Sequence, residues 1–125
     1  MALQLEQNTS YHTFSGHGPG YVAINGRRFE QALVVYRTEL HLDWGAHDFA
    51  TLTPAHFEYF LALRPEVVLV GTGARQHFAR PELYRALIES GIAVEFMDTP
   101  AACRTYNILV GEERKVVAAV FPATA

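Results

Sequence analysis

Residues 92–110 run Ile-Ala-Val-Glu-Phe-Met-Asp-Thr-Pro-Ala-Ala-Cys-Arg-Thr-Tyr-Asn-Ile-Leu-Val, and their hydrophobic pattern changes once. The apolar run over 92–97 is typical of a short strand, which we expect over 93–97. Thr99 and Pro100 then mark a helix start, with Thr99 as the expected N-cap. The helix is predicted over 99–110, with an inward stripe of Ala102, Tyr106 and Leu109.

A similar order of elements occurs earlier in the chain. The all-apolar run 67–70 predicts a strand that is covered on both faces, and it ends in Gly71-Thr72-Gly73. Pro81 starts a second helix that Gly91 ends, with its buried side made by Leu83, Leu87 and Ile88. We expect the two strands to be neighbours, so that their polar ends mark one site.

The remaining segments predict a hairpin, one more helix and a closing strand. Asn25-Gly26 is a two-residue hairpin signal between strands over 21–25 and 28–35, whereas 40–49 is predicted to be a loop or an edge strand. Thr53-Pro54 starts a helix, which Pro65 ends. The helix buries Phe57, Phe60 and Leu61, and the last strand runs over 115–121. The prediction is one α/β domain over 1–125, with its core at about 10–122 and a mixed central sheet flanked by helices.

Composition excludes several classes of protein. The chain has 125 residues, of which 50% are apolar and 18% are charged, so it is long enough for a core and is not disordered. Its net charge of −3 and scattered basic residues argue against nucleic-acid binding. The single cysteine cannot form an internal disulfide, and we expect a cytoplasmic location. We expect no signal peptide in residues 1–8 and no membrane span.

Three segments together resemble one known family. They are Val-Leu-Val-Gly-Thr-Gly at 68–73, Ser-Gly-Ile at 90–92, and Glu-Phe-Met-Asp-Thr-Pro-Ala-Ala-Cys-Arg-Thr-Tyr-Asn-Ile-Leu at 95–109. This set is similar to the Mth938-like family of small α/β domains, which includes a mitochondrial assembly factor for NADH dehydrogenase (complex I) and uncharacterised bacterial proteins. The resemblance implies a three-layer fold with a mixed sheet, and no established enzymatic activity or cofactor.

The candidate ligand or partner cleft lies at the two strand ends. Its predicted residues are Gly71, Thr72, Gly73, Arg75, Asp98, Thr99, Cys103, Arg104 and Thr105. Part of a dinucleotide-binding pattern is present, but position 76, where its third glycine would fall, is Gln76, and the next helix starts only near Pro81. The alternative is that these glycines let the chain turn sharply off the strand.

Two side chains of the predicted helix start have competing interpretations. A thiol at a helix N-terminus can have a lowered pKa, which would make Cys103 reactive, or Cys103 is a small buried residue that packs against the sheet. Arg104 with Thr99 and Thr105 forms an anion pocket, or it pairs with Asp98 or Glu95 and fixes the loop. The histidines match no metal motif, including His41 and His47 with Asp43. We therefore expect no metal and no cofactor.

The sequence alone assigns no reaction. The leading hypothesis is a non-enzymatic interaction or assembly domain with an unidentified protein partner, in which Trp44 and Phe49 are anchor residues. The alternative is a small-molecule or anion-binding protein, including an enzyme that uses Cys103, at the cleft around Gly71–Arg75 and Thr99–Thr105. A homodimer through residues 40–49 is a third alternative.

Overall fold

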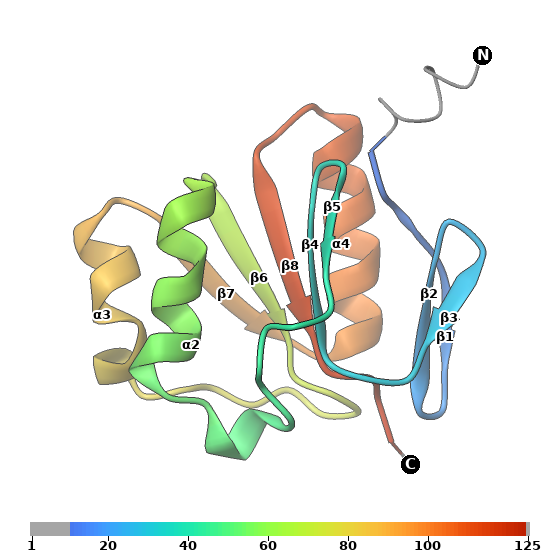
Figure 1. Ribbon diagram of the computed structural model, residues 1–125, viewed down its shortest axis with the longest axis horizontal. Coiled ribbons are helices and arrows are strands. Elements are labelled where there is room, and N and C mark those ends of the chain that lie inside the picture. The colour runs from blue at the N-terminus through green and yellow to red at the C-terminus, as the bar shows by residue number, and fades with distance from the viewer. Residues whose placement is uncertain (1–10, 125) are drawn as a thin grey trace.

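The computed structural model describes residues 11–124 and contains two β-sheets and a set of helices (Figure 1). Residues 1–8, where the sequence predicts no signal peptide, lie outside this part. The larger sheet has five strands in the order β5-β4-β8-β6-β7. These strands are β4 (Leu33–Tyr36), β5 (Glu39–His41), β6 (Val67–Gly71), β7 (Ala93–Met97) and β8 (Val116–Val120). The sheet is mixed, because β6 runs parallel to β7 and β8 whereas β4 is antiparallel to β5 and β8.

The smaller sheet has three antiparallel strands in chain order. They are β1 (Phe14–Gly18), β2 (Tyr21–Ile24) and β3 (Arg27–Phe29). The hairpin at Asn25-Gly26 is confirmed, and both residues have the positive φ that this turn requires, 51° and 84°.

The single returning strand predicted over 28–35 is wrong. The chain leaves the small sheet after Phe29, turns through the exposed residues Glu30 and Gln31, and starts β4 in the large sheet. Phe29 at the end of β3 and Leu33 at the start of β4 are nevertheless buried in the same core. In residues 40–49 the predicted edge strand is present as β5, which ends at His41.

Helices cover both faces of the large sheet. On one face lie η1 (Phe49–Thr51), α2 (Pro54–Glu58), η2 (Tyr59–Leu63) and α3 (Pro81–Glu89). On the other face lie α4 (Thr99–Gly111) and the small sheet. Two buried clusters therefore sandwich the sheet, and β6, buried at all five positions, contributes to both.

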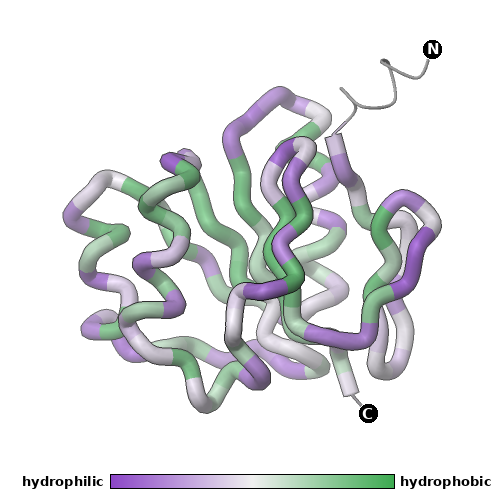
Figure 2. The backbone as a smooth tube through the Cα atoms, viewed as in Figure 1, coloured by the Kyte–Doolittle hydropathy of each residue, from purple (hydrophilic) through white to green (hydrophobic). Residues whose placement is uncertain are grey.

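Hydrophobicity follows these layers (Figure 2). The tube is hydrophobic along β6 and becomes hydrophilic in the charged turn that precedes β8. The predicted bounds of β6, β7, α3 and α4 hold to within one residue. One predicted core position is wrong: Ile88 is 53% exposed, whereas Leu83 and Leu87 on the same helix pack inward.

Candidate functional site

The ends of β6 and β7 meet at one edge of the large sheet, as the sequence predicts. The two strands pair in parallel, and Gly71 stands beside Met97. The main-chain N–H of Thr72 donates to the carbonyl oxygen of Met97 at 2.9 Å, and that of Thr99 donates to the carbonyl oxygen of Gly73 at 2.9 Å. Thr72, Gly73, Asp98 and Thr99 are therefore brought together.

The capping role that the sequence predicts for Thr99 belongs to its neighbour. Asp98 is the N-cap of α4, and its carboxylate accepts a hydrogen bond from the N–H of Ala101 at 2.8 Å. Thr99 is fully buried. Its hydroxyl accepts from the N–H of Gly73 at 2.9 Å and donates to the carbonyl oxygen of Phe121. The hydroxyl thus joins the segments that follow β6 and β8, and its burial keeps it out of reach of a ligand.

Gly71 and Gly73 each need to be glycine, but for different structural reasons. Gly73 has a φ of +103°, which favours glycine, so it makes the sharp turn expected after the strand. Gly71 has no such φ but lies against α4. A Cβ atom there would come within 2.9 Å of Val120 Cγ1 and 3.1 Å of Ala102 Cβ. The Gly-Thr-Gly pattern therefore serves close packing and a turn, and α3 starts only at Pro81, as expected.

Thr72 organises the loop that follows. Its hydroxyl donates to the carbonyl oxygen of Arg75 and accepts from the N–H of His77 at 3.1 Å. In residues 75–78 of this loop, successive side chains lie on opposite sides of the main chain. Arg75 and His77 line a pocket, whereas Gln76 and Phe78 contact Phe96 in β7.

The pocket is open and has a volume of about 510 Å³. It lies between the loop after β6, the segment before β4, η1 and the chain after β8. Its ionisable lining residues are Glu30, His47, Asp48, Arg75 and His77. Phe49 closes one side by stacking on His77, with ring centroids 5.8 Å apart. The mixed charge and the aromatic wall suit a polar ligand or a side chain of a partner.

Four predicted site residues on α4 do not line this pocket, namely Thr99, Cys103, Arg104 and Thr105, and neither do Gly71 and Asp98. Cys103 is 3% exposed, and burial raises the pKa of its thiol to about 12, against a smaller opposite effect of Arg104. Of the two interpretations of Cys103, the lowered thiol pKa is therefore not supported, and the side chain packs in the core against the sheet. Arg104 is exposed and, within residues 11–124, forms no ion pair with Asp98 or Glu95. Thr105 is half-buried.

The Cys-Arg-Thr-Tyr-Asn segment has mainly a structural role. Tyr106 is fully buried, and its ring meets Phe14 edge-on at 5.4 Å. The side-chain amide of Asn107 donates to the carbonyl oxygen of Phe14 at 2.8 Å, and its oxygen accepts from the Phe14 N–H at 2.9 Å. These two bonds fasten β1 of the small sheet to α4.

Of the two predicted anchors, one is buried and the other lines the pocket. Trp44 is 5% exposed, packs against Phe60 and Phe121, and donates its indole N–H to the carbonyl oxygen of His56. It is a core residue and not an anchor. Sequence reasoning missed Phe78, which is 71% exposed. An aromatic residue outside any predicted helix or strand was the only signal that could have found it.

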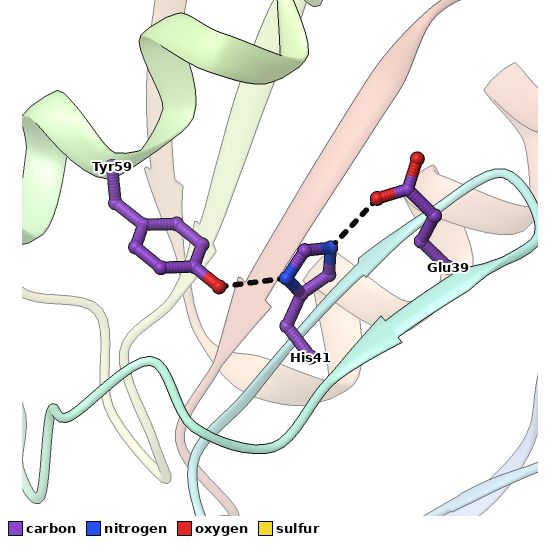
Figure 3. Close-up of polar contacts among 3 residues, drawn as sticks. All are labelled: Glu39, His41 and Tyr59. Carbon is purple, nitrogen blue, oxygen red and sulfur yellow. Dashed lines mark hydrogen bonds and ion pairs between the residues drawn. The ribbon is translucent and has the colours of Figure 1, made fainter.

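The histidine-rich segment forms hydrogen bonds and not a metal cluster. His41 lies between Tyr59 and Glu39, with Nδ1 2.6 Å from the phenol oxygen and Nε2 2.9 Å from the carboxylate (Figure 3). The hydrogen bond between His41 and Tyr59 connects edge strand β5 to η2. Among residues 11–124, no three His, Cys, Asp or Glu side chains are placed to hold a metal ion. The pKa of Tyr59 is raised, first by burial and then by Asp43 and Glu39, so the phenol is not an activated nucleophile.

The chain is similar to one protein family and to proteins of several organisms. The model of a family described as a protein of unknown function, DUF498/DUF598, matches residues 14–121. The chain belongs to this family. A bovine (Bos taurus) relative, NADH dehydrogenase [ubiquinone] 1 alpha subcomplex assembly factor 3, is 34% identical over 96% of this chain and 65% of its own length. This chain thus spans just under two thirds of that relative.

Other relatives and solved structures match this chain over most of their own length. The 13 kDa major membrane protein of Francisella tularensis is 31% identical over 93% of this chain and 95% of its own. A Bordetella parapertussis crystal structure has a TM-score of 0.86 and 41% identity over 91% of this chain and 98% of that chain. A Bordetella pertussis structure, described as a Mth938-like domain, has a TM-score of 0.77 and 34% identity over 90% and 87%. The predicted Mth938-like fold is confirmed.

Within residues 11–124, no helix combines the length and the apolar composition that a membrane span requires.

Proposed function

We propose that this chain is a protein-binding domain that assists the assembly of a multi-subunit complex. The observation that carries the proposal is the 34% identity, over 96% of the chain, to an assembly factor for NADH dehydrogenase. That relative is longer, so the shared domain accounts for only part of it. NADH dehydrogenase is accordingly the first complex to examine.

The pocket and the loop beside it are the proposed binding surface. Arg75 and His77 present charge and hydrogen-bond donors there, and Phe49 adds an aromatic wall. The Thr72 hydroxyl bonds the main chain at Arg75 and His77, so the backbone of the loop is held in place before a partner binds. Pre-organised polar groups around an aromatic wall are features of protein-binding sites.

We expect a defined partner to co-purify with the tagged chain from its source cell in a fixed ratio. We also expect cells that lack the chain to accumulate less of the mature complex that contains this partner. An Arg75→Glu substitution should weaken partner capture by about tenfold, because it reverses the charge of the side chain at position 75. The matched variant Arg104→Glu makes the same charge change at an exposed site outside the pocket and should retain the partner. Unchanged levels of every complex in the deletion strain would refute an assembly role.

The pocket also supports a second function, the binding of a small anion. Arg75 and His77 line it together, and a guanidinium suits phosphate or carboxylate. We expect one compound from a panel of phosphate esters, nucleotides and carboxylates to raise the melting temperature, since selective binding stabilises the folded state. The shift should disappear in Arg75→Ala and persist in Arg104→Ala. A shift that survives in Arg75→Ala would place the ligand elsewhere.

A further inference from the structure

The β7 strand has an open outer edge. It is the last strand of the large sheet on the side opposite β5 (Figure 1). The N–H of Ala93 donates to the carbonyl oxygen of Glu66, and the carbonyl oxygen of Met97 accepts from Thr72, so both face β6. Because main-chain groups alternate in direction along a strand, those of Val94 and Phe96 face outward.

Most of these outward groups have no hydrogen-bond partner within residues 11–124. The exception is the carbonyl oxygen of Phe96, which accepts from the side-chain amide of Gln76 at 2.8 Å. The N–H and C=O of Val94 and the N–H of Phe96 have no hydrogen-bond partner within residues 11–124. The opposite edge is shorter, with three residues in β5, and it carries the exposed Glu39 and the tie from His41 to Tyr59. β7 has no proline, lysine or bulge to discourage pairing.

An exposed aromatic side chain lies next to this edge. The ring of Phe78 is 6.1 Å from that of Phe96, and Phe78 is 71% exposed. Phe78 also follows the loop residues that line the pocket, so the edge continues the proposed binding surface. On the other face of β7, Glu95 is exposed and, within residues 11–124, has no ion-pair partner.

We propose that the outer edge of β7 binds an extended segment of a partner protein as a sixth strand of the sheet. This inference rests on the proposed function and names the kind of partner. Main-chain groups of the segment bond Val94 and Phe96, an apolar side chain packs on Phe78, and a basic side chain faces Glu95. A second copy of the chain fits less well. In the antiparallel register that pairs Val94 with Phe96, one Glu95 would lie opposite the other, and like charges there are unfavourable.

The test uses the full chain and a short peptide of alternating valine and lysine. In the free chain, the amides of Val94 and Phe96 should exchange with solvent faster than those of Ala93 and Glu95. With the peptide present at about 1 mM, a concentration that detects weak binding, their exchange should slow by tenfold or more. Phe78→Ala and Glu95→Lys should each weaken binding by about fivefold to tenfold. Ile108→Ala, which truncates another exposed apolar residue, on α4, should not change it.

Five outcomes would overturn the proposal. Slow exchange of Val94 and Phe96 in the free chain would mean that the edge is already covered. Absence of binding by the peptide, or equal binding by its copy with N-methylated peptide bonds, would exclude main-chain pairing. A doubled mass in light scattering, lost in Val94→Pro, would assign the edge to a second copy. If the co-purified partner stays bound to Val94→Pro and Phe78→Ala, the edge proposal fails and the assembly function stands.

Discussion

We expect the Cys103 thiol of the native chain to react with iodoacetamide about a thousand times more slowly than the unfolded chain near pH 8. Only the thiolate reacts, and burial raises the thiol pKa from 9.0 to about 12, a difference of three pH units. The thiol is also 3% exposed, so the reagent needs a local opening of the fold to reach it. The measurement compares alkylation rates, by mass spectrometry, in buffer and in concentrated guanidinium chloride.

A native rate within tenfold of the unfolded rate would contradict this expectation and return the thiol-enzyme alternative to consideration. A second readout follows from the same pKa shift. The folded state holds the thiol proton more tightly than the unfolded state does, so this stabilisation is complete below about pH 9 and is lost as the pH rises toward 12. The difference in free energy of unfolding between the native chain and Cys103→Ala should therefore narrow above about pH 9. A constant difference would contradict the shift.

The sequence predicts the parallel half of this fold well. Hydrophobic runs with proline and glycine boundaries locate β6, α3, β7 and α4, because each of those signals acts on the backbone nearby. The meeting of Gly71–Gly73 with Asp98 and Thr99 also follows, since two parallel strands joined by a helix end at the same edge. The change of sheet between Phe29 and Leu33 could not be predicted. It depends on where the apolar side chains of both strands are buried, and periodicity within one segment does not contain that information.

The candidate site was predicted less completely than the fold. The sequence placed the residues after β6 and those on α4 together, but not the directions of their side chains. Thr72, Gly73 and Arg75 line the pocket, whereas Cys103, Arg104 and Thr105 do not. Closeness at a strand end does not determine the direction of a side chain, and α4 turns Cys103 into the core within its second turn. Trp44 and Phe78 show the same limit. Both are aromatic residues of irregular segments, yet one is buried and the other exposed, and only long-range packing separates them.

Thr99→Val should lower the free energy of unfolding by about 2–4 kcal/mol, because it leaves two buried main-chain groups without a partner. Valine has nearly the same shape as threonine, so the loss comes from the hydroxyl and not from a cavity. The groups concerned are the N–H of Gly73 and the carbonyl oxygen of Phe121. Urea unfolding measures the effect, and the melting temperature should fall by roughly 10 °C for a chain of this size.

Two control variants on α4 test whether the loss of stability comes from removing the Thr99 hydroxyl or from a threonine-to-valine change in general. Thr105→Val makes the same change at a half-buried position in the helix and should alter the free energy of unfolding by less than about 0.5 kcal/mol. Thr99→Ser keeps the hydroxyl and removes one methyl group, which should cost about 1 kcal/mol. Equal losses in Thr99→Val and Thr105→Val would show that the hydroxyl does not hold the two segments together. If the predicted order holds, the loop that carries Arg75, His77 and Phe78 is anchored from beneath by Thr99. Thr99→Val should then also speed amide exchange at residues 73–77, whereas Thr105→Val should leave it unchanged.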